Sequence, residues 1–590
     1  MLDCMRKTRK SKQRSPARSE CVVHRSVRSS ASSNMDQDGE VNYQWDRLHD
    51  WIYCVCVVTF DLELGQAMEE VYPPNTVLTE EDKTNICYLA FPDSNSSCMG
   101  DTQFHIRIKL CSSSTVMSSC HIAYNNTCPV FLRINPQFLF GFVYFRQIKD
   151  QSIPRGYFQK SVIILTRLPF ISLFSEICSI IAPEYFESGL KSIEAACHEI
   201  NRWQPPVPGD TLKLGLFGTV IQSQIPREFV TYVNSAGITM NGRAMPPLFS
   251  TVYDLNVFES FSCIIHHIHV LWELVLIGEP LVVLAPSPEL CSRLVQALVS
   301  MIVPLMYNAD YRPYFTIHDS EFKEYMTKTK SPPTVILGVT NPFFGKTLQH
   351  WPHIIRLAET SGSSSSNKQK LKRNSSMTFF DAKTGVYTHY KPFLQKDKNV
   401  IKRLIKGMQV KRPGEVQTAI LRRHLLELTE SFIIPLERYM STLMPLKKNI
   451  SPYKSAPRPL PFNPDDFIAS LESSGPHLTS SVKGNWEGLY RRFFRSANFS
   501  GWYNTRYQSM AKKLKVLQLE ALSHINIQEW LNGKEEVEVV DMILKIKNKI
   551  EEIDNEDLHL NEITQIQLKN RLNDVILSLP DDLRNIINIS

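Results

Sequence analysis

The sequence of 590 residues predicts an α/β protein with an additional, mostly helical region, arranged in three modules. Three observations favour this class. Short apolar segments that suit β-strands dominate the first part of the chain, and strand-like segments alternate with helix-like ones in the middle. Toward the end, apolar residues recur at intervals of three and four, which is typical of helices. At roughly 150 residues per domain, the length allows three or four domains.

Five strand-like segments and a helical one predict an α+β module over residues 48–203. Phe104–Leu110 alternates apolar and polar residues, as a strand with one buried face does. Short polar gaps between the segments favour a mostly antiparallel sheet. The other strand candidates are Trp51–Phe60, Asn85–Phe91, Phe138–Phe145 and Gly156–Leu165, and the helical segment is Pro169–Trp203. Prolines at 205, 206 and 208 end this module, and residues 204–247 are expected to be a linker.

Residues 248–358 alternate between helix-like and strand-like segments, which predicts an α/β module with parallel strands. Ser-Pro-Glu at 287–289 is a helix-start signal, because Ser suits the N-cap and Pro the first helical turn. The expected helices are Phe258–Gly278, Ser287–Met301 and Asp319–Thr327, and the expected strands are Pro280–Ala285, Tyr314–Ile317 and Thr334–Val339.

The Ser- and Lys-rich composition of residues 359–380 predicts a mobile loop, and residues 381–590 are expected to be mostly helical. Two apolar stripes at helical spacing support the second expectation. They comprise Val539, Met542, Ile546, Ile550 and Ile553, and then Leu568, Leu572, Val575 and Leu579.

The formal charge of +7 belongs to the N-terminal segment. Residues 1–34 contain nine basic and two acidic residues, so the rest of the chain is neutral by count. Residues 1–46 are therefore expected to be a disordered basic leader, since they are too poor in apolar residues to form a core. A nucleic-acid-binding domain carries its basic excess on the folded part, so no nucleic acid is expected as a partner. The thirteen cysteines form no CxxC pair and are expected to be reduced, in a soluble intracellular protein.

Two short motifs resemble a phosphate-binding loop and a metal site, but the residues around them argue against both interpretations. Gly338–Thr347 ends in Gly-Lys-Thr, yet position 340 is Thr where a phosphate loop needs Gly, and Pro342 removes a donor. A turn that packs Phe343 and Phe344 into the core is the preferred interpretation. His266, His269 and Glu273 share a helix face in apolar surroundings, which favours core histidines over a metal site. We therefore expect no catalytic residue, metal or cofactor.

The segment Trp486–Tyr507 mixes aromatic residues with arginines, as some single-strand nucleic-acid binders do. Tyr490, Phe493 and Phe494 lie at helical spacing, and the neutral body lacks a wider basic surface. Helix packing with stacked arginines is the preferred interpretation, and a partner surface is the alternative.

Longer segments identify a family. The chain resembles the DENN-domain family, and within it the DENN domain-containing protein 6 subgroup, from about Trp51 to the C-terminus. The segments that carry this resemblance are Cys56–Gln66, Leu271–Pro286, Asp310–Asp319, Gly338–Pro342 and Ser431–Arg438.

This resemblance implies a longin-like fold for the first module and guanine-nucleotide exchange on a Rab-family small GTPase. In this subgroup it implies the Rab numbered fourteen, and a cytoplasmic protein that is recruited to recycling endosomes. The alternative is a non-catalytic Rab effector or scaffold that uses the same surface. Membrane association is expected through the partner, and the basic leader is a hypothetical second contact with an anionic leaflet.

In the family the GTPase lies across the first two modules, so the strand-end loops of the central module are the expected contact region. Asp319 has an alternative role as a helix cap, and Asn341 has one in a turn with Pro342. The candidate partner-binding residues are Tyr311, Arg312, Asp319, Asn341 and Phe343.

Overall fold

The fold is that of a computed structural model, in which two compact units are defined, residues 1–45 and residues 46–590. It describes residues 34–35, 41–42, 45–61, 63, 65–93, 98–111, 117–152, 156–227, 250–327, 331–358, 383–471, 482–555, 558, 560–581 and 583–584. In the first unit, β1 (Asn34–Met35) pairs antiparallel with β2 (Val41–Asn42). Most of the expected basic leader and the expected loop at 359–380 lie outside the described residues.

The first module of the second unit contains a five-stranded antiparallel sheet, as predicted, in the order β4-β3-β7-β6-β5. One predicted member is wrong, because Asn85–Phe91 belongs mainly to helix α2. Thr79 caps this helix and Asp82 completes a capping box, so the helix begins before the predicted segment. The apolar segment itself is too short to reveal a helical period. The strands are β3 (Cys54–Asp61), β4 (Gly65–Tyr72), β5 (Gly100–Lys109), β6 (Phe138–Lys149) and β7 (Tyr157–Thr166), and α2 spans Glu80–Leu89.

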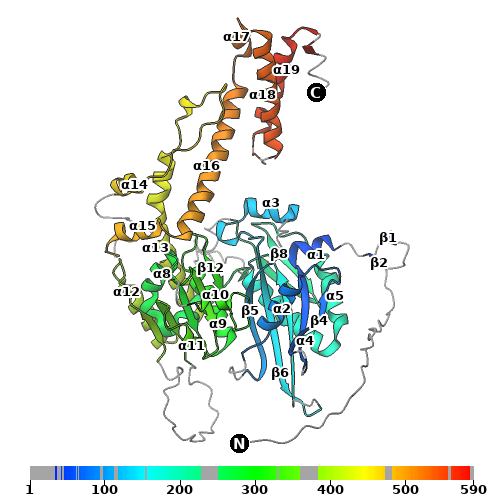
Figure 1. The fold of residues 1–590 in the computed structure, drawn as a ribbon, viewed down its shortest axis with the longest axis vertical. Coiled ribbons are helices and arrows are strands. Elements are labelled where there is room, and N and C mark those ends of the chain that lie inside the picture. The colour runs from blue at the N-terminus through cyan, green and yellow to red at the C-terminus, as the bar shows by residue number, and fades with distance from the viewer. Residues whose placement is uncertain are drawn as a thin grey trace, which may run out of the picture. The chain divides into compact units, whose positions relative to one another are not determined.

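Helices pack against both faces of this sheet. Cys54, Cys56 and Val58 alternate along β3 and share a core with α2, whereas α4 (Ile171–Ser188) contacts β5, β6 and β7. The helical segment predicted at Pro169–Trp203 comprises α4 and α5 (Leu190–Ile200). Figure 1 shows these elements in blue and cyan, together with α1 (Asp46–Trp51), α3 (Ser119–Thr127) and the 3-10 turn η1 (Val130–Leu132).

Residues 204–247, expected as a linker, include regular structure in their described part. β8 (Thr211–Leu216) and β9 (Thr219–Gln224) form an antiparallel hairpin, and β10 (Ser250–Thr251) adds to it in parallel. Leu212, Leu214 and Leu216 point to the buried side of β8, since alternate strand residues face the same way.

The central module contains a second sheet in the order β12-β13-β11-β14-β15. The first four strands pair in parallel, as predicted, and β15 is antiparallel. The strands are β11 (Leu281–Leu284), β12 (Asp310–Arg312), β13 (Val335–Val339), β14 (His353–Arg356) and β15 (Gly385–Thr388). The helices are α7 (Val257–Phe261), the 3-10 turn η2 (Ser262–His267), α8 (Ile268–Leu276), α9 (Pro288–Ser300), α10 (Phe322–Tyr325) and α11 (Phe344–Thr347).

Three predictions for this module are wrong in detail. The single helix expected at Phe258–Gly278 is divided into α7, η2 and α8, because Ile264 leaves the helical conformation with φ of −125°. The strand expected at Tyr314–Ile317 lies earlier, at β12, and Tyr314 and Phe315 follow it as buried residues outside the sheet. These two residues are apolar because tertiary contacts bury them, and a short apolar segment of this kind also suits a strand. The helix expected at Asp319–Thr327 is reduced to the single turn α10.

The remaining described part of the chain is mostly helical, as predicted. The predicted apolar stripes of α18 and α19 share one core with the end of α16. Figure 1 shows α18 and α19 side by side. The elements are α12 (Lys398–Gln409), α13 (Gly414–Thr442), η4 (Lys447–Asn449), α14 (Pro464–Ser470), α15 (Trp486–Phe493), α16 (Ala497–Ser523), α17 (Ile527–Leu531), α18 (Glu536–Asn555) and α19 (Glu562–Leu577). In the described residues, no helix combines the length and the hydrophobicity that a membrane span requires.

Candidate functional site

Two of the five candidate residues lie in a polar network between the first and central modules. Arg107 on β5 donates to Asp310 on β12 over 2.6 Å and to the carbonyl of Tyr311 over 3.2 Å. Its guanidinium also stacks 3.5 Å from the ring centroid of Phe138 and 4.2 Å from that of Tyr311. The buried guanidinium of Arg107 thus has an ion pair, hydrogen bonds and cation–π contacts to compensate its loss of hydration.

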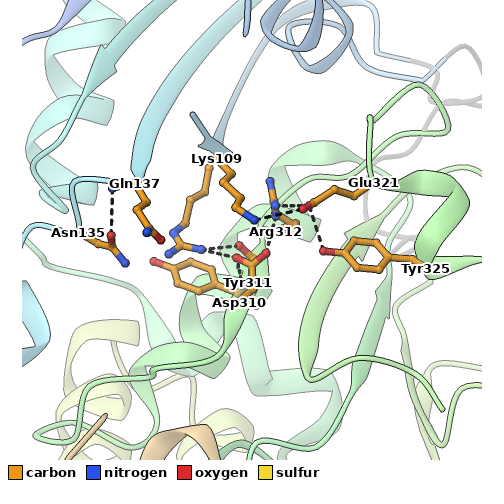
Figure 2. A network of polar contacts seen from close by, with 9 residues as sticks. Lys109, Asn135, Gln137, Asp310, Tyr311, Arg312, Glu321 and Tyr325 are labelled. Carbon is orange, nitrogen blue, oxygen red and sulfur yellow. Dashed lines mark hydrogen bonds and ion pairs between the residues drawn. The ribbon is translucent and has the colours of Figure 1, made fainter. Parts of the chain in front are cut away.

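Arg312 extends the same network into the loop that follows β12. Its Nε donates to Asp310 over 2.9 Å, and its Nη2 pairs with Glu321. Glu321 also accepts from the Tyr325 hydroxyl over 3.1 Å and lies 3.7 Å from the Lys109 ammonium. Figure 2 shows that Asp310 and Glu321 form the acidic centre of the network, with Lys109 and Arg312 beside them.

Burial governs the electrostatics of this network. It lowers the pKa of Arg107 from its ordinary value, because the charged guanidinium is removed from water. It would also lower the pKa of Arg312, but Asp310 and Glu321 outweigh that effect and raise this pKa. Arg107 and Arg312 therefore compensate Asp310 and Glu321, and removing any one of the four leaves the network with an unbalanced charge.

A second polar contact joins the modules at the carboxyl end of β13. Thr340 donates its hydroxyl proton to the Asp93 carboxylate over 2.7 Å. The amide of Asp93 donates to the Tyr314 hydroxyl, which in turn donates to the carbonyl of Phe91. Burial raises the pKa of Asp93, although these hydrogen bonds oppose the shift. The first module thus holds the strand-end loop of the central module directly.

The structure separates the five candidates into buried and accessible residues. Tyr311 is 7% exposed, Arg312 2% and Asp319 5%, so these three lie beneath the surface of the folded chain. Asp319 accepts from the amide of Glu321 over 3.0 Å, which forms a local turn before α10. The alternative role as a helix cap is wrong, because Glu321 holds the N-cap position of α10 and no side chain caps this helix. Asn341 is partly buried and Phe343 is 48% exposed.

Asn341 and Phe343 form an accessible corner beside the intermodule contact. The side chain of Asn341 accepts from the Phe343 amide over 3.0 Å, which makes the turn expected with Pro342. Phe344 is fully buried as predicted, whereas Phe343 is not, because its ring lies over Phe322 at the surface. An exposed aromatic ring held by a short turn suits partner contact.

Sequence reasoning did not find Arg107, Asp310 or Asp93. Arg107 and Asp93 lie in none of the segments that carry the family resemblance, and Asp310, which begins the segment Asp310–Asp319, is 203 positions from Arg107. The alternation along β5 does not reveal Arg107 either, because it places this residue on the face opposite Ile106 and Ile108, where an arginine is expected to meet solvent.

A mixed groove of about 760 Å³ adds a second accessible surface, formed by all three modules. Its walls combine apolar side chains with cationic and amide groups, as protein-binding surfaces do. The lining residues that define its character are Phe131, Arg133, Met306, Trp502, Lys512 and Lys513.

The other motifs have structural roles. His269 pairs with His424 through their Nε2 atoms at 3.0 Å, and Glu273 accepts from Tyr390 and from two backbone amides. The expectation for His266 is wrong, because it lies in η2, before α8 begins, and is exposed. In the part of the chain that the structure describes, no cluster of three His, Cys, Asp or Glu side chains could hold a metal. Tyr490 stacks on Phe432 with ring centroids 4.2 Å apart, so the aromatic segment at 486–507 contributes to helix packing.

Comparison with protein families assigns both ends of the second unit. Residues 52–194 match the family described as "Transport protein Avl9", and residues 527–590 match the family described as "DENND6 C-terminal domain". With the two sheets and the helical region, these matches define a DENN-domain protein.

Relatives that match over most of their length identify the subgroup of DENN-domain proteins. Mouse "Protein DENND6B" is 50% identical over 566 residues, covering 95% of this chain and 96% of the relative. Chicken "Protein DENND6A" is 51% identical over 552 residues, covering 92% and 94%. "Protein DENND6 homolog" of Dictyostelium discoideum is 31% identical over 570 residues, covering 85% and 77%. The chain belongs to the DENND6 family.

Proposed function

We propose that this chain is a guanine-nucleotide exchange factor that promotes GDP release from a Rab-family small GTPase. Membership of the DENND6 family carries this proposal, because DENN-domain proteins generally act with Rab GTPases. We assign it to endosomal recycling traffic, with the Rab numbered fourteen as the first substrate to test. The five-stranded antiparallel sheet, with α2 and α4 on opposite faces, supports a longin-like first module.

Exchange of this kind needs differential binding rather than covalent chemistry. A Rab holds its nucleotide with switch segments that are ordered by phosphate and magnesium. A factor that binds the nucleotide-free, displaced state more tightly than the loaded state shifts the equilibrium toward GDP release. The factor must therefore present a surface that does not itself rearrange. The two polar contacts between the modules supply such rigidity, since both combine buried groups with short hydrogen bonds.

We place the GTPase across the first and central modules, with Asn341 and Phe343 as direct contacts. Phe343 is accessible and Asn341 holds its turn. Tyr311, Arg312 and Asp319 are buried, and we assign them an indirect role in which they keep the strand-end loop in place. The groove lined by Phe131, Met306 and Trp502, to which the helical module also contributes, offers further apolar contact area.

The decisive experiment follows release of a fluorescent GDP analogue from a panel of Rab GTPases that includes the Rab numbered fourteen. The full chain should accelerate release from at least one member, and no acceleration across the panel would overturn the proposal. A pull-down with nucleotide-free and GTP-loaded GTPase completes the test. A preference for the GTP-loaded form would instead establish the effector or scaffold function.

A further inference from the structure

Helix α12 presents a purely cationic face to solvent. On an α-helix of 3.6 residues per turn, Lys398, Lys402 and Lys406 align at intervals of four, and Arg403 lies next to them. All four side chains are exposed. The only other exposed residues of this helix are Asn399 and Gln409, which are uncharged. Asp397, the acid that precedes the helix, is buried and accepts from the amides of Asn399 and Val400.

The opposite face fixes the orientation of the helix. Ile401 and Leu404 are buried, and the carbonyl of Leu404 accepts from the Gln417 side chain of α13 over 2.9 Å. Gly407 lies so close to Gln417 that a Cβ at this position would overlap the amide group. Because this contact holds α12 against α13, the cationic face cannot rotate toward the protein.

This arrangement is unfavourable for the helix taken alone. Like charges at intervals of four repel each other, and Lys398 in the first turn faces the positive end of the helix dipole. Among the described residues, no ion pair links Lys398, Lys402, Arg403 or Lys406 to an acid. An anionic surface outside the chain would supply the missing compensation.

The turn after α12 adds exposed apolar groups to the cationic face. Val410 is 61% exposed and Val416 is 46% exposed. Between them, Lys411 adopts a left-handed conformation with φ of 52°, which a residue with a side chain adopts rarely. The turn thus carries Val410 and Lys411 at the surface, beside the four cations of the helix, whereas Val416 lies in the first turn of α13 next to the exposed acid Glu415.

We propose that the exposed face of α12 and its following turn dock the protein on an anionic lipid bilayer. Lysines predominate on this face, and a lysine is a compact charge on a flexible stem, which suits a fluid layer of headgroups. A bidentate site for one acidic protein group would favour arginine instead. Val410, which directly follows the helix and is exposed, can enter the boundary between headgroups and acyl chains. This docking surface is independent of the proposed exchange activity.

The test measures co-sedimentation of the full chain with vesicles. One set contains phosphatidylcholine alone, and the other contains about 30 mol% phosphatidylserine, an anionic lipid of cytoplasmic leaflets. The test variant is Lys402→Glu with Arg403→Glu and Lys406→Glu. The control variant is Lys447→Glu with Lys448→Glu and Lys454→Glu, which makes the same change in net charge at exposed sites. The control sites follow the C-terminal end of α13, a helix of 29 residues and so about 40 Å long, whose N-terminal part contacts α12.

The wild-type chain should bind the anionic vesicles and not the neutral ones. The α12 variant should lose at least about tenfold in its partition coefficient, since each cation near the surface contributes about fivefold. The control should stay within about twofold of wild type, and the basic leader contributes equally to all three proteins. If the Glu variant fails to fold, the corresponding triple Gln variant takes its place. Equal binding by the α12 variant and wild type would overturn the proposal in favour of an acidic protein partner, and equal losses in both variants would overturn it as well.

Discussion

The Nη1 atom of Arg107 lies 2.6 Å from the Asp310 carboxylate and joins the edge strand of one sheet to the edge strand of another. β5 and β12 belong to different modules, so this ion pair fixes the position of the central module against the first. Arg107 is almost fully buried, whereas the Asp310 side chain is 25% exposed and also bonds Arg312. The contact therefore stabilises the module interface rather than either sheet alone.

Replacing Arg107 with Ala should destabilise the folded chain strongly. Asp310 would keep only Arg312 as its cation, and breaking a buried pair of this kind costs about 3 kcal/mol. Thermal unfolding of the variant measures the loss.

Arg146→Ala is the matched control, since Arg146 forms two hydrogen bonds of 2.7 Å to Asp101 on the same sheet but at its surface. It should cost less than about 1 kcal/mol. Equal losses in both variants would contradict the role given to the buried pair.

The buried pair of His269 and His424 should make stability fall in mild acid. Burial lowers the pKa of His269 from 6.5 to about 4, and the pKa of His424 is also lowered by burial. As the pH falls through 6.5, the unfolded chain takes up a proton on His269 and the folded chain does not. Between pH 7.5 and 5.5, His269 should therefore remove about 1 kcal/mol from the free energy of unfolding, and the lowered pKa of His424 acts in the same direction.

Urea denaturation at the two pH values checks this prediction. His424→Gln should reduce the difference between them, while His524→Gln, at an exposed position, should leave it unchanged. Part of the response should survive in His424→Gln, because burial also lowers the pKa of His105 to about 4. An undiminished response in this variant would contradict the role given to the pair.

Gly338→Ala should abolish stable folding of the central module. A Cβ at this position would overlap the carbonyl oxygen of Pro313 and come within 2.8 Å of the Cys291 sulfur. Backbone atoms on a neighbouring segment cannot move aside cheaply, and overpacking typically costs about 1–3 kcal/mol or more.

Soluble yield and the midpoint of thermal unfolding measure the effect. Gly215→Ala on β8 is the control, because a Cβ there meets nothing within 4 Å. Similar yields and midpoints for both variants would mean that β13 can shift away from Pro313.

Phe343→Ala should impair exchange activity without affecting the fold. An exposed aromatic ring adds little to stability, but at an interface it acts as an anchor whose loss costs about 1–2 kcal/mol of binding, or five- to thirtyfold. GDP release from the responsive Rab gives the rate, and circular dichroism monitors folding. Tyr453→Ala, at another exposed aromatic residue, should retain the wild-type rate. Wild-type activity in Phe343→Ala would remove this residue from the proposed contact surface.

Much of the fold was predictable because its signals are local. The alternation of Phe104, Ile106 and Ile108 predicted β5, and Ser287 before Pro288 predicted the start of α9. Hydrophobic patterns did not predict the correct element where the segment was short or only partly buried. β4 contains no fully buried residue and was missed, and α2 was taken for a strand although Thr79 and Asp82 form its capping box.

The sequence by itself determined the fold class, the parallel pairing of the central strands and the family resemblance, since these depend on hydrophobic period and on long ordered motifs. Only the tertiary structure decided which candidate residues are accessible. Tyr311 and Arg312 are buried because Arg107 and Glu321 reach them from other segments, while Phe343 stays exposed at the end of β13. Burial and ion pairing depend on distances between residues far apart in the chain, and no local pattern encodes those distances.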